Sequence, residues 1–482
     1  MSAIVTAIAA AMRGPADRKV SMKTLRLANL GIVSGLALAA LPFAASAQTA
    51  QPVISPAPVA TSPAPQPAAP APAVSPTATP STTAVVTPPV PNPNPVMRWP
   101  LAQAQALAAV IESIDDEGLT PADYQPAALR AAIAKGEGAE LDAQASKSFT
   151  WLTEDLRDGR TPMKARVQWF AFDKDMDVNP TEAVMKRALE SGDVAGTLAA
   201  LSPTYPDYAA LKQALAEATN AKTRNAIRAN MDRWRWFSRD LGEYYLITNV
   251  PEYQLRLVRK DTIVRTYRTI VGKPGRTATP QLAELVEGVV FNPTWTVPQS
   301  IVKGEGLGAQ LLANPASARA QGYAVSRGSD GMITVVQQPG PKNALGLMKL
   351  DMPNPHAIFL HDTPNRSLFN LANRALSHGC VRTERASELA IAMAIIGGGK
   401  TGDEAAEISA SGKYTKVPMS KRQMPVYIGY FTYARSIDGT LKAFPDIYGR
   451  DAPVLASLAA PRQMKTGQRK STEAVIKLDN PL

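Results

Sequence analysis

The spacing of apolar residues changes at Glu243, and this change sets the fold class of the 482-residue chain. Before it, from residue 98 to about residue 240, apolar side chains recur at helical intervals. After it, short runs of β-branched and aromatic residues are separated by turn residues, a pattern typical of strands. Helices followed by strands indicate an α+β chain, and a chain of this length commonly forms more than one domain. We therefore predict a helical domain over residues 98–240 and a mainly β domain over residues 241–458.

Individual elements follow from the same patterns. The predicted helices are residues 101–114, 147–157, 182–190, 208–218 and 385–396. The predicted strands are residues 244–250, 254–259, 263–271, 285–291, 333–336, 346–350, 357–360 and 426–433. A Gly/Ala-rich segment, 298–328, carries helical pieces at 309–313 and 316–320 and is predicted to be an insertion in the sheet. The segment 220–239 mixes tryptophans with arginines, and we interpret it as interdomain packing rather than as a binding site.

The N-terminus has the features of an export signal. Five basic residues precede the apolar run 27–44, which ends in the small residues Ala45-Ser46-Ala47. This order is typical of a cleaved secretory signal peptide, here residues 1–47, and it predicts a periplasmic protein. The apolar run is nearly long enough to span a bilayer, so an uncleaved membrane anchor is the alternative. Met22, followed closely by Lys23, offers an alternative start of translation.

Residues 48–97 are predicted to be a disordered linker. Of the 41 prolines, 15 lie between Gln48 and Val96, and no charged residue occurs between Arg26 and Arg98. Such a Pro/Ala-rich segment has too little apolar mass to form a core and favours extended polyproline II structure. At the other end of the chain, residues 459–482 are predicted to be a polar, disordered tail.

The net charge of +11 excludes few functions by itself. Removal of residues 1–47 leaves 47 basic against 40 acidic residues, a surplus of seven. A modest positive charge suits an anionic wall polymer, a membrane surface or an ordinary solvated surface equally well. No basic run interleaved with aromatic residues is present, so nucleic acid is not an expected partner.

All three histidines and the single cysteine fall within 25 consecutive positions, at His356, His361, His378 and Cys380. A lone cysteine with histidines in reach is a candidate covalent catalyst. A free thiol outside the reducing cytoplasm is exposed to oxidation, so a purely structural cysteine is disfavoured there. These residues therefore predict a working thiol.

The phrase that surrounds the cysteine offers the other parts of a nucleophilic site. His361 follows a predicted strand and could accept the thiol proton, while Arg382 adds positive charge. Gly379 permits close backbone approach, so main-chain N–H groups beside Cys380 are candidates for an oxyanion hole. Ser377 and His378 are candidates for orienting these partners or for polarising a substrate carbonyl, and we predict His378 to be catalytic together with Cys380 and His361.

Two other interpretations of the cluster compete with catalysis. A zinc site with mixed ligands is the first, although His356 and His361 lack the spacing and the carboxylate of a metallopeptidase motif. The second is a structural role for the histidines, which we favour only for His356, behind Pro353-Asn354-Pro355. We predict no metal and no cofactor.

At these residues the chain resembles the YkuD-type L,D-transpeptidases. In that family a histidine is followed, fourteen to seventeen residues later, by Ser/Thr-His-Gly-Cys and an apolar residue. Here fifteen residues separate His361 from Ser377-His378-Gly379-Cys380. Further phrases resemble the YcbB-type subfamily, namely residues 230–236, 249–251, 270–273, 338–340, 343–346 and 360–364.

The resemblance implies a YkuD-like β-sandwich as catalytic domain, with an inserted cap at about 298–328 and a helical scaffold domain before it. It also implies that Cys380 attacks a donor stem peptide of peptidoglycan, releases D-alanine and passes the acyl group to a second stem in a 3→3 cross-link. His361 would be the general base, helped by an oxygen near Asp362, and Arg382 would bind a substrate carboxylate. Carbapenems are expected covalent inhibitors, and other cell-wall synthesis proteins are candidate partners.

The chain departs from the subfamily in one respect. A helical peptidoglycan-binding module often precedes the phrase at 230–236, and here only residues 209–229 lie in that place. Wall targeting must then come from the cap, the scaffold or the basic surface. An L,D-carboxypeptidase, a transferase to an outer-membrane lipoprotein and a non-catalytic wall-binding scaffold remain as alternatives.

Overall fold

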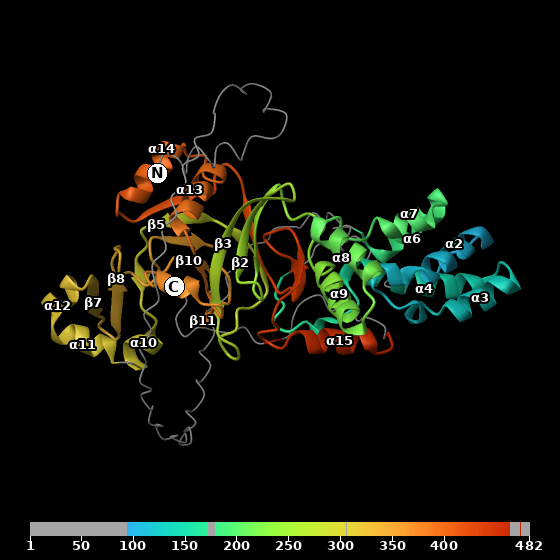
Figure 1. The fold of residues 1–482 in the computed structure, drawn as a ribbon, viewed down its shortest axis with the longest axis horizontal. Coiled ribbons are helices and arrows are strands. Elements are labelled where there is room, and N and C mark those ends of the chain that lie inside the picture. Colours follow the sequence, from blue (N-terminus) through green and yellow to red (C-terminus); the bar gives the residue numbers. More distant parts are fainter. Residues whose placement is uncertain (1–93, 172–178, 305, 463–472, 474–482) are drawn as a thin grey trace, which may run out of the picture. The chain divides into compact units, whose positions relative to one another are not determined.

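The computed structural model of the chain describes residues 94–171, 179–304, 306–462 and 473 (Figure 1). The predicted signal peptide, nearly all of the predicted linker and most of the predicted tail lie outside these residues. Within the described residues, no helix combines the length and the apolar character needed to cross a membrane.

The first half of the described chain is helical, as the sequence predicts. Its helices are α2 (Leu101–Glu112), α3 (Pro126–Lys135), α4 (Ala139–Asp158), α6 (Thr181–Ser191), α7 (Val194–Ala199), α8 (Pro206–Glu217) and α9 (Ala221–Trp234). Residues of α2, α4, α6 and α7 bury one apolar cluster, with Trp99 and Phe149 among its largest side chains. The sequence analysis did not identify α3 and α7, because short Ala-rich segments carry little helical periodicity.

A second apolar cluster joins α8 and α9 to the strands that follow. Trp234 stacks on Phe431 with ring centroids 4.5 Å apart, and Trp236 contacts Trp169 edge-on at 5.4 Å. Both belong to a cluster that includes buried residues of three strands of the large sheet, so the aromatic and basic segment 220–239 packs between the helices and the sheet, as predicted.

The second half contains an 11-stranded sheet. Its strands are β1 (Tyr244–Asn249), β2 (Gln254–Arg259), β3 (Thr262–Gly272), β4 (Leu282–Val286), β5 (Gly288–Phe291), β9 (Met348–Asp351), β10 (Leu360–His361), β11 (Ala375–Ser377), β12 (Val381–Thr383), β13 (Thr415–Pro418) and β14 (Met424–Gly429). The order is β13-β5-β9-β10-β12-β3-β2-β1-β14-β4, with β11 paired to β3. Only Glu287 separates β4 at one end from β5 near the other, so the sheet curls back on itself. Helices followed by a curled sheet confirm the predicted α+β class.

Helices and a hairpin complete this half. They are α13 (Ala386–Ile396), α14 (Gly402–Ala410), α15 (Asp451–Ala459), β15 (Tyr433–Arg435) and β16 (Leu441–Ala443). Helix α13 is buried along most of its length against the apolar residues of the sheet. The predicted strand 285–291 is two strands, β4 and β5, and the predicted strand 426–433 ends at Gly429 before β15 begins.

The predicted insertion forms a unit with its own core. It contains β6 (Trp295–Thr296), α10 (Gln299–Gly304), α11 (Leu307–Ala313), α12 (Pro315–Ala320), β7 (Tyr323–Arg327) and β8 (Ile333–Gln337). The three strands form a separate sheet, β6-β8-β7, and a small apolar cluster centred on Val297 and Val335 fills its interior. Both helical pieces predicted within 298–328 are present as α11 and α12.

Candidate active site

A row of three side chains crosses the middle of the large sheet. His361 in β10 pairs with Lys349 in β9 on one side and with Arg382 in β12 on the other. Residues paired directly across strands project from the same face of a sheet, so the imidazole lies between two cations. The neighbouring pair, Leu360 and Val381, is fully buried. Register thus gathers three polar groups from segments that are far apart in sequence.

Cys380 immediately precedes β12, and its half-buried thiol lies beside this row. The charges of Lys349 and Arg382 both act on the thiol. Its Sγ atom lies 3.7 Å from the carbonyl oxygen of Ala357, to which it donates a hydrogen bond, rather than to His361. The structure therefore places the thiol near Arg382 and Lys349, the two cations that flank the predicted base, His361. Nothing in the sequence had marked Lys349.

The turn that carries the cysteine is fixed by its own side chains. The buried hydroxyl of Ser377 donates to the carbonyl of Cys380 at 2.6 Å and accepts from the N–H of Gly379 at 3.1 Å. Gly379 has φ +127°, and a Cβ there would lie 2.8 Å from Ile358 Cδ1. Only glycine adopts this conformation without strain. Because Ser377 already accepts the Gly379 N–H, the roles of both residues in this structure are to shape the turn.

Two residues outside the motif support that turn, one from the segment between β3 and β4 and one from the C-terminal segment. Thr279 donates its hydroxyl to the carbonyl of Gly379 at 2.7 Å and accepts from the N–H of Gly272 at 2.8 Å. Tyr448 donates to the Gly272 carbonyl at 2.6 Å. The phrase at 270–273 is the only sequence signal for this contact, because nothing local marked Thr279 or Tyr448.

The segment before His361 is a loop rather than the predicted strand 357–360. Asn354 donates to the carbonyls of Met352 and Ile358, at 2.8 and 2.6 Å, and accepts from the N–H of Ile358. Ala357 has φ +51°, which a strand cannot accommodate. The asparagine therefore closes a turn that aims the Ala357 carbonyl at the thiol, and only Leu360 and His361 extend as β10.

Burial keeps the side chains of His361 and Cys380 neutral. It lowers the pKa of His361 to about 3, and the charges of Arg382 and Lys349 act in the same direction, against backbone groups of Asp362 and Leu345. Burial raises the pKa of Cys380 to about 11, although Phe359, Lys349 and Arg382 oppose the shift. At neutral pH the pair is thus a thiol and an uncharged imidazole, which is the protonation state needed for the imidazole to accept a proton.

Asp362 shapes the approach to the site through the backbone. It is fully buried, and its Oδ2 accepts from the Leu347 N–H at 2.9 Å and from Arg366 Nη2 at 2.8 Å. A Cβ on Gly346 would lie 2.4 Å from its carboxyl carbon, so the chain needs glycine there. The carboxylate therefore holds the segment that leads into β9, and hence Lys349.

The remaining histidines lie in different surroundings. His378 is exposed on the turn. His356 is buried, and its ring lies 4.0 Å from that of Phe170, an arrangement consistent with the structural role predicted for it. In the part of the chain that the structure describes, no group of three His, Cys, Asp or Glu side chains is placed to hold a metal ion.

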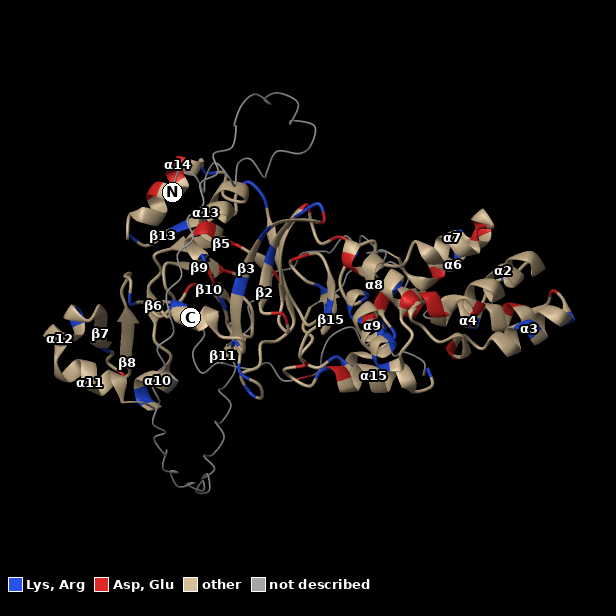
Figure 2. Ribbon diagram, viewed as in Figure 1, with Lys and Arg blue, Asp and Glu red and all other residues tan. Residues whose placement is uncertain are grey.

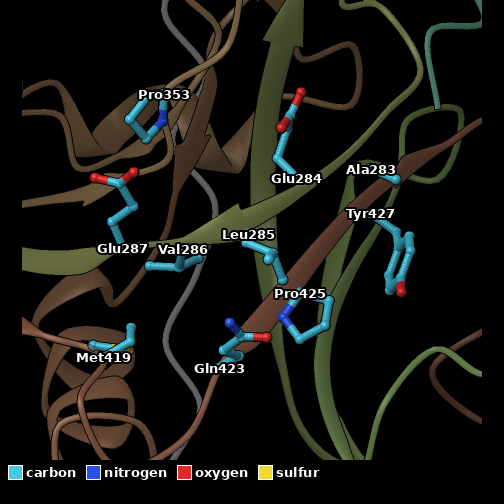
Figure 3. Close-up of a pocket in the computed structure, with 10 residues that line it drawn as sticks. All are labelled: Ala283, Glu284, Leu285, Val286, Glu287, Pro353, Met419, Gln423, Pro425 and Tyr427. Carbon is cyan, nitrogen blue, oxygen red and sulfur yellow. The ribbon is translucent and has the colours of Figure 1, made fainter. Parts of the chain in front are cut away.

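A cavity of about 630 Å³ lies apart from the residues of the cysteine site (Figure 3). It follows β4, β14 and the bend between β4 and β5, and its lining includes Glu284, Pro353 and Tyr427. Burial raises the pKa of Glu284 to about 7. No cysteine or histidine lines the cavity, so it is separate from the residues predicted to carry the chemistry.

Comparison with known proteins agrees with this geometry. Residues 243–418 match the L,D-transpeptidase catalytic domain, and residues 98–215 match the scaffold domain. A Haemophilus influenzae protein named "Putative L,D-transpeptidase" is 33% identical over 224 residues, which are 43% of this chain and 45% of that protein. The match thus spans less than half of that relative.

Two solved structures are also similar. An L,D-transpeptidase from Mycobacterium smegmatis has 12% identity and a TM-score of 0.19 over 39% of this chain and 58% of that one. L,D-transpeptidase 1 of Mycobacterium tuberculosis has 15% identity and a TM-score of 0.17 over 38% and 60%. At these TM-scores the two structures carry no argument about the arrangement of this chain.

Proposed function

We propose that this chain, which carries the L,D-transpeptidase catalytic domain over residues 243–418, forms 3→3 cross-links between stem peptides of peptidoglycan. The observation that carries the proposal is the alignment of Lys349, His361 and Arg382 beside the only thiol of the chain. A nucleophile, a neutral base and unpaired positive charge are the groups that acyl transfer through a thioester requires.

The reaction follows from these groups. The Cys380 thiol gives its proton to His361 and attacks the carbonyl of the third residue of a donor tetrapeptide. The tetrahedral intermediate collapses to a thioester as His361 returns the proton to the departing amine of D-alanine. The side-chain amine of a second stem then attacks the thioester, loses a proton to His361, and restores the thiol as the new amide forms.

The other predicted residues have supporting roles in this proposal. Ser377 and Gly379 shape the turn, and Asp362 holds the segment before β9. His378, exposed on the turn, would orient the substrate, and Arg382 would bind a substrate carboxylate as a fixed cation. The enzyme would act at the cell wall, in the periplasm, and carbapenems would acylate the same thiol.

The test uses the chain from residue 48 onward and a purified disaccharide-tetrapeptide. Dimers whose fragmentation places the bond between two third-position residues, together with free D-alanine, are the expected products. Cys380→Ala should form none, with the same circular-dichroism spectrum as the wild-type chain.

Other products would replace the proposal with an alternative. Tripeptide without dimer would mean that water is the acceptor and that the chain is an L,D-carboxypeptidase. Transfer only to an added lipoprotein would identify a lipoprotein ligase, and unchanged substrate would indicate a non-catalytic wall-binding protein. Normal dimer formation by Cys380→Ala would refute the covalent mechanism.

A further inference from the structure

Lys349 is a half-buried lysine whose surroundings suggest a part in the chemistry. It pairs across the strands with His361, and its Nζ lies 4.5 Å from the centroid of the Phe359 ring. That ring lies 5.5 Å from the imidazole of His361. The ammonium is thus packed over an aromatic face in the same row as the base.

No carboxylate neutralises the two cations of this row. Among the described residues, neither Lys349 nor Arg382 forms an ion pair, and the buried Nε of Arg382 has no hydrogen-bond partner. Asp351, two residues further along β9, pairs instead with Lys416 of β13. Leaving positive charge unpaired in a partly desolvated place costs free energy, so such a place favours an anion.

Burial lowers the pKa of Lys349, and the negative charges of Asp351 and of an ionised Cys380 oppose that shift. Lys349 and Cys380 interact electrostatically, and the interaction favours both the charged ammonium and the thiolate. The same charge opposes protonation of His361. The charged groups that act on the thiol are Lys349 and Arg382, and those that act on Lys349 in turn include Asp351 and Lys416.

We propose that Lys349 is a further functional residue of the site, which stabilises the Cys380 thiolate and keeps His361 unprotonated until the substrate arrives. This inference deepens the proposed function and rests on it only in that Cys380 is the nucleophile. The proton balance is that of the first step above: the thiol proton passes to His361, and the ammonium of Lys349 keeps its own protons. Because Lys349 also disfavours the imidazolium, it promotes rapid return of that proton to the leaving amine.

The size of the effect can be estimated. An opposite charge at about 4–6 Å shifts a pKa by roughly one to three units. Below the pKa of the thiol, one unit changes the thiolate fraction tenfold. Removal of the charge should therefore slow any reaction of the thiolate roughly tenfold at each pH, without a change in the slope of log rate against pH.

The experiment measures alkylation of the single thiol by iodoacetamide, a neutral reagent, from pH 7 to 9.5. Wild type is compared with Lys349→Met, Lys349→Gln and Lys349→Arg. Lys400→Met is the matched control, because Lys400 is solvent-exposed in part and pairs only with Glu404. Thermal unfolding of each variant shows that the comparison is between folded proteins. Two different neutral side chains are used at position 349, so that a change in folding or in reagent access caused by only one of them can be recognised.

We expect the plot of log alkylation rate against pH to have the same slope in every variant. The rate should be about tenfold lower in Lys349→Met and Lys349→Gln, and close to wild type in Lys349→Arg and Lys400→Met. Alkylation rates equal to those of wild type at every pH in both neutral variants would overturn the inference. A uniform loss in Lys349→Arg as well would indicate a structural role.

The assay needs no peptidoglycan, so it separates the two proposals. If the wild-type chain makes no cross-links but the neutral Lys349 variants are alkylated more slowly, the proposed function is refuted and the role of Lys349 is supported. If the chain makes cross-links but the alkylation rates of the variants equal those of wild type, the proposed function is supported and the role of Lys349 is refuted.

Discussion

The helical region and the cysteine site treat buried charge in opposite ways. In the helices, buried cations have acidic partners: Arg462 pairs with Asp155 at 3.0 Å, and Arg235 lies 3.4 Å from Glu117. Figure 2 shows acidic and basic residues interspersed on α4, α8 and α9. At the site, Lys349 and Arg382 have no such partner among the described residues. Paired charge stabilises a fold locally, whereas unpaired charge remains available to a reaction.

The pKa values express the same contrast. Burial disfavours ionisation of Glu117, yet Arg235, Lys212 and Tyr208 outweigh it and lower its pKa to about 2. At the site, burial dominates, and Cys380 and His361 are both held neutral. A carboxylate surrounded by cations and hydrogen-bond donors stays ionised and stabilises the fold. A neutral thiol and a neutral imidazole are in the protonation states from which a proton can pass from one to the other. Perturbed groups of the second kind are common at functional sites.

The largest expected effect comes from removing the base. His361→Ala should lower kcat/KM for cross-linking by roughly 100- to 10,000-fold, because the thiol then has no positioned proton acceptor. Initial rates with the disaccharide-tetrapeptide measure it. His356→Phe, which retains an aromatic ring against Phe170, is the matched control and should stay near wild type. Activity of His361→Ala within tenfold of wild type would contradict the assigned role.

Removing a charge partner in the helical region should affect stability and not chemistry. Asp155→Ala leaves Arg462 and Arg160 without the carboxylate that they share and should lower the free energy of unfolding by about 3 kcal/mol or more. Urea denaturation measures the loss, with exposed Asp116→Ala as control. Under conditions where the variant is folded, Cys380 should react with iodoacetamide at the wild-type rate. A slower alkylation of Cys380 in Asp155→Ala would show that the charge pairs of the helical region also affect the cysteine site.

Alanine substitutions at two glycines with positive φ distinguish the cost of backbone strain from the cost of a steric clash. Gly439 has φ +85° and open space around it, so Gly439→Ala should cost roughly 1–2 kcal/mol through the backbone alone. In Gly379→Ala the new methyl group also meets Ile358, which should cost roughly 1–3 kcal/mol more and displace the thiol. Denaturation and cross-linking rates test both variants. Equal stability and full activity would show that the turn does not need its glycine.

The smallest expected effect depends on pH. Because burial raises the pKa of Glu284 from 4.5 to about 7, the folded state binds a proton more tightly than the unfolded chain. Stability attributable to this group is therefore present below pH 4.5 and lost as the pH rises to about 7. Glu284→Gln should raise the melting temperature by roughly 2 °C at pH 8 and leave it unchanged at pH 4. A gain of equal size at both pH values would mean that the carboxyl titrates normally.

The sequence alone determined the order of structure and predicted which residue is the nucleophile. Apolar spacing is a local property, so the change at Glu243 predicted helices before strands, and most of the predicted elements are present. The proposal that Cys380 works with His361 was also accessible, since a unique thiol among clustered histidines can be noticed without knowledge of the fold. The domain limits and the site roles remain predictions.

Only the tertiary structure brought Lys349 beside His361, and Thr279 and Tyr448 beneath the turn. These contacts depend on register between strands that are far apart in the chain, and local propensity carries no information about register. The predicted strand at 357–360 was wrong for a related reason, because the side chain of Asn354 closes a turn that apolar alternation cannot reveal. Sequence thus predicted which side chains react. The pairing of strands decided which charges surround them, because electrostatic interactions depend on distance in space rather than on separation along the chain.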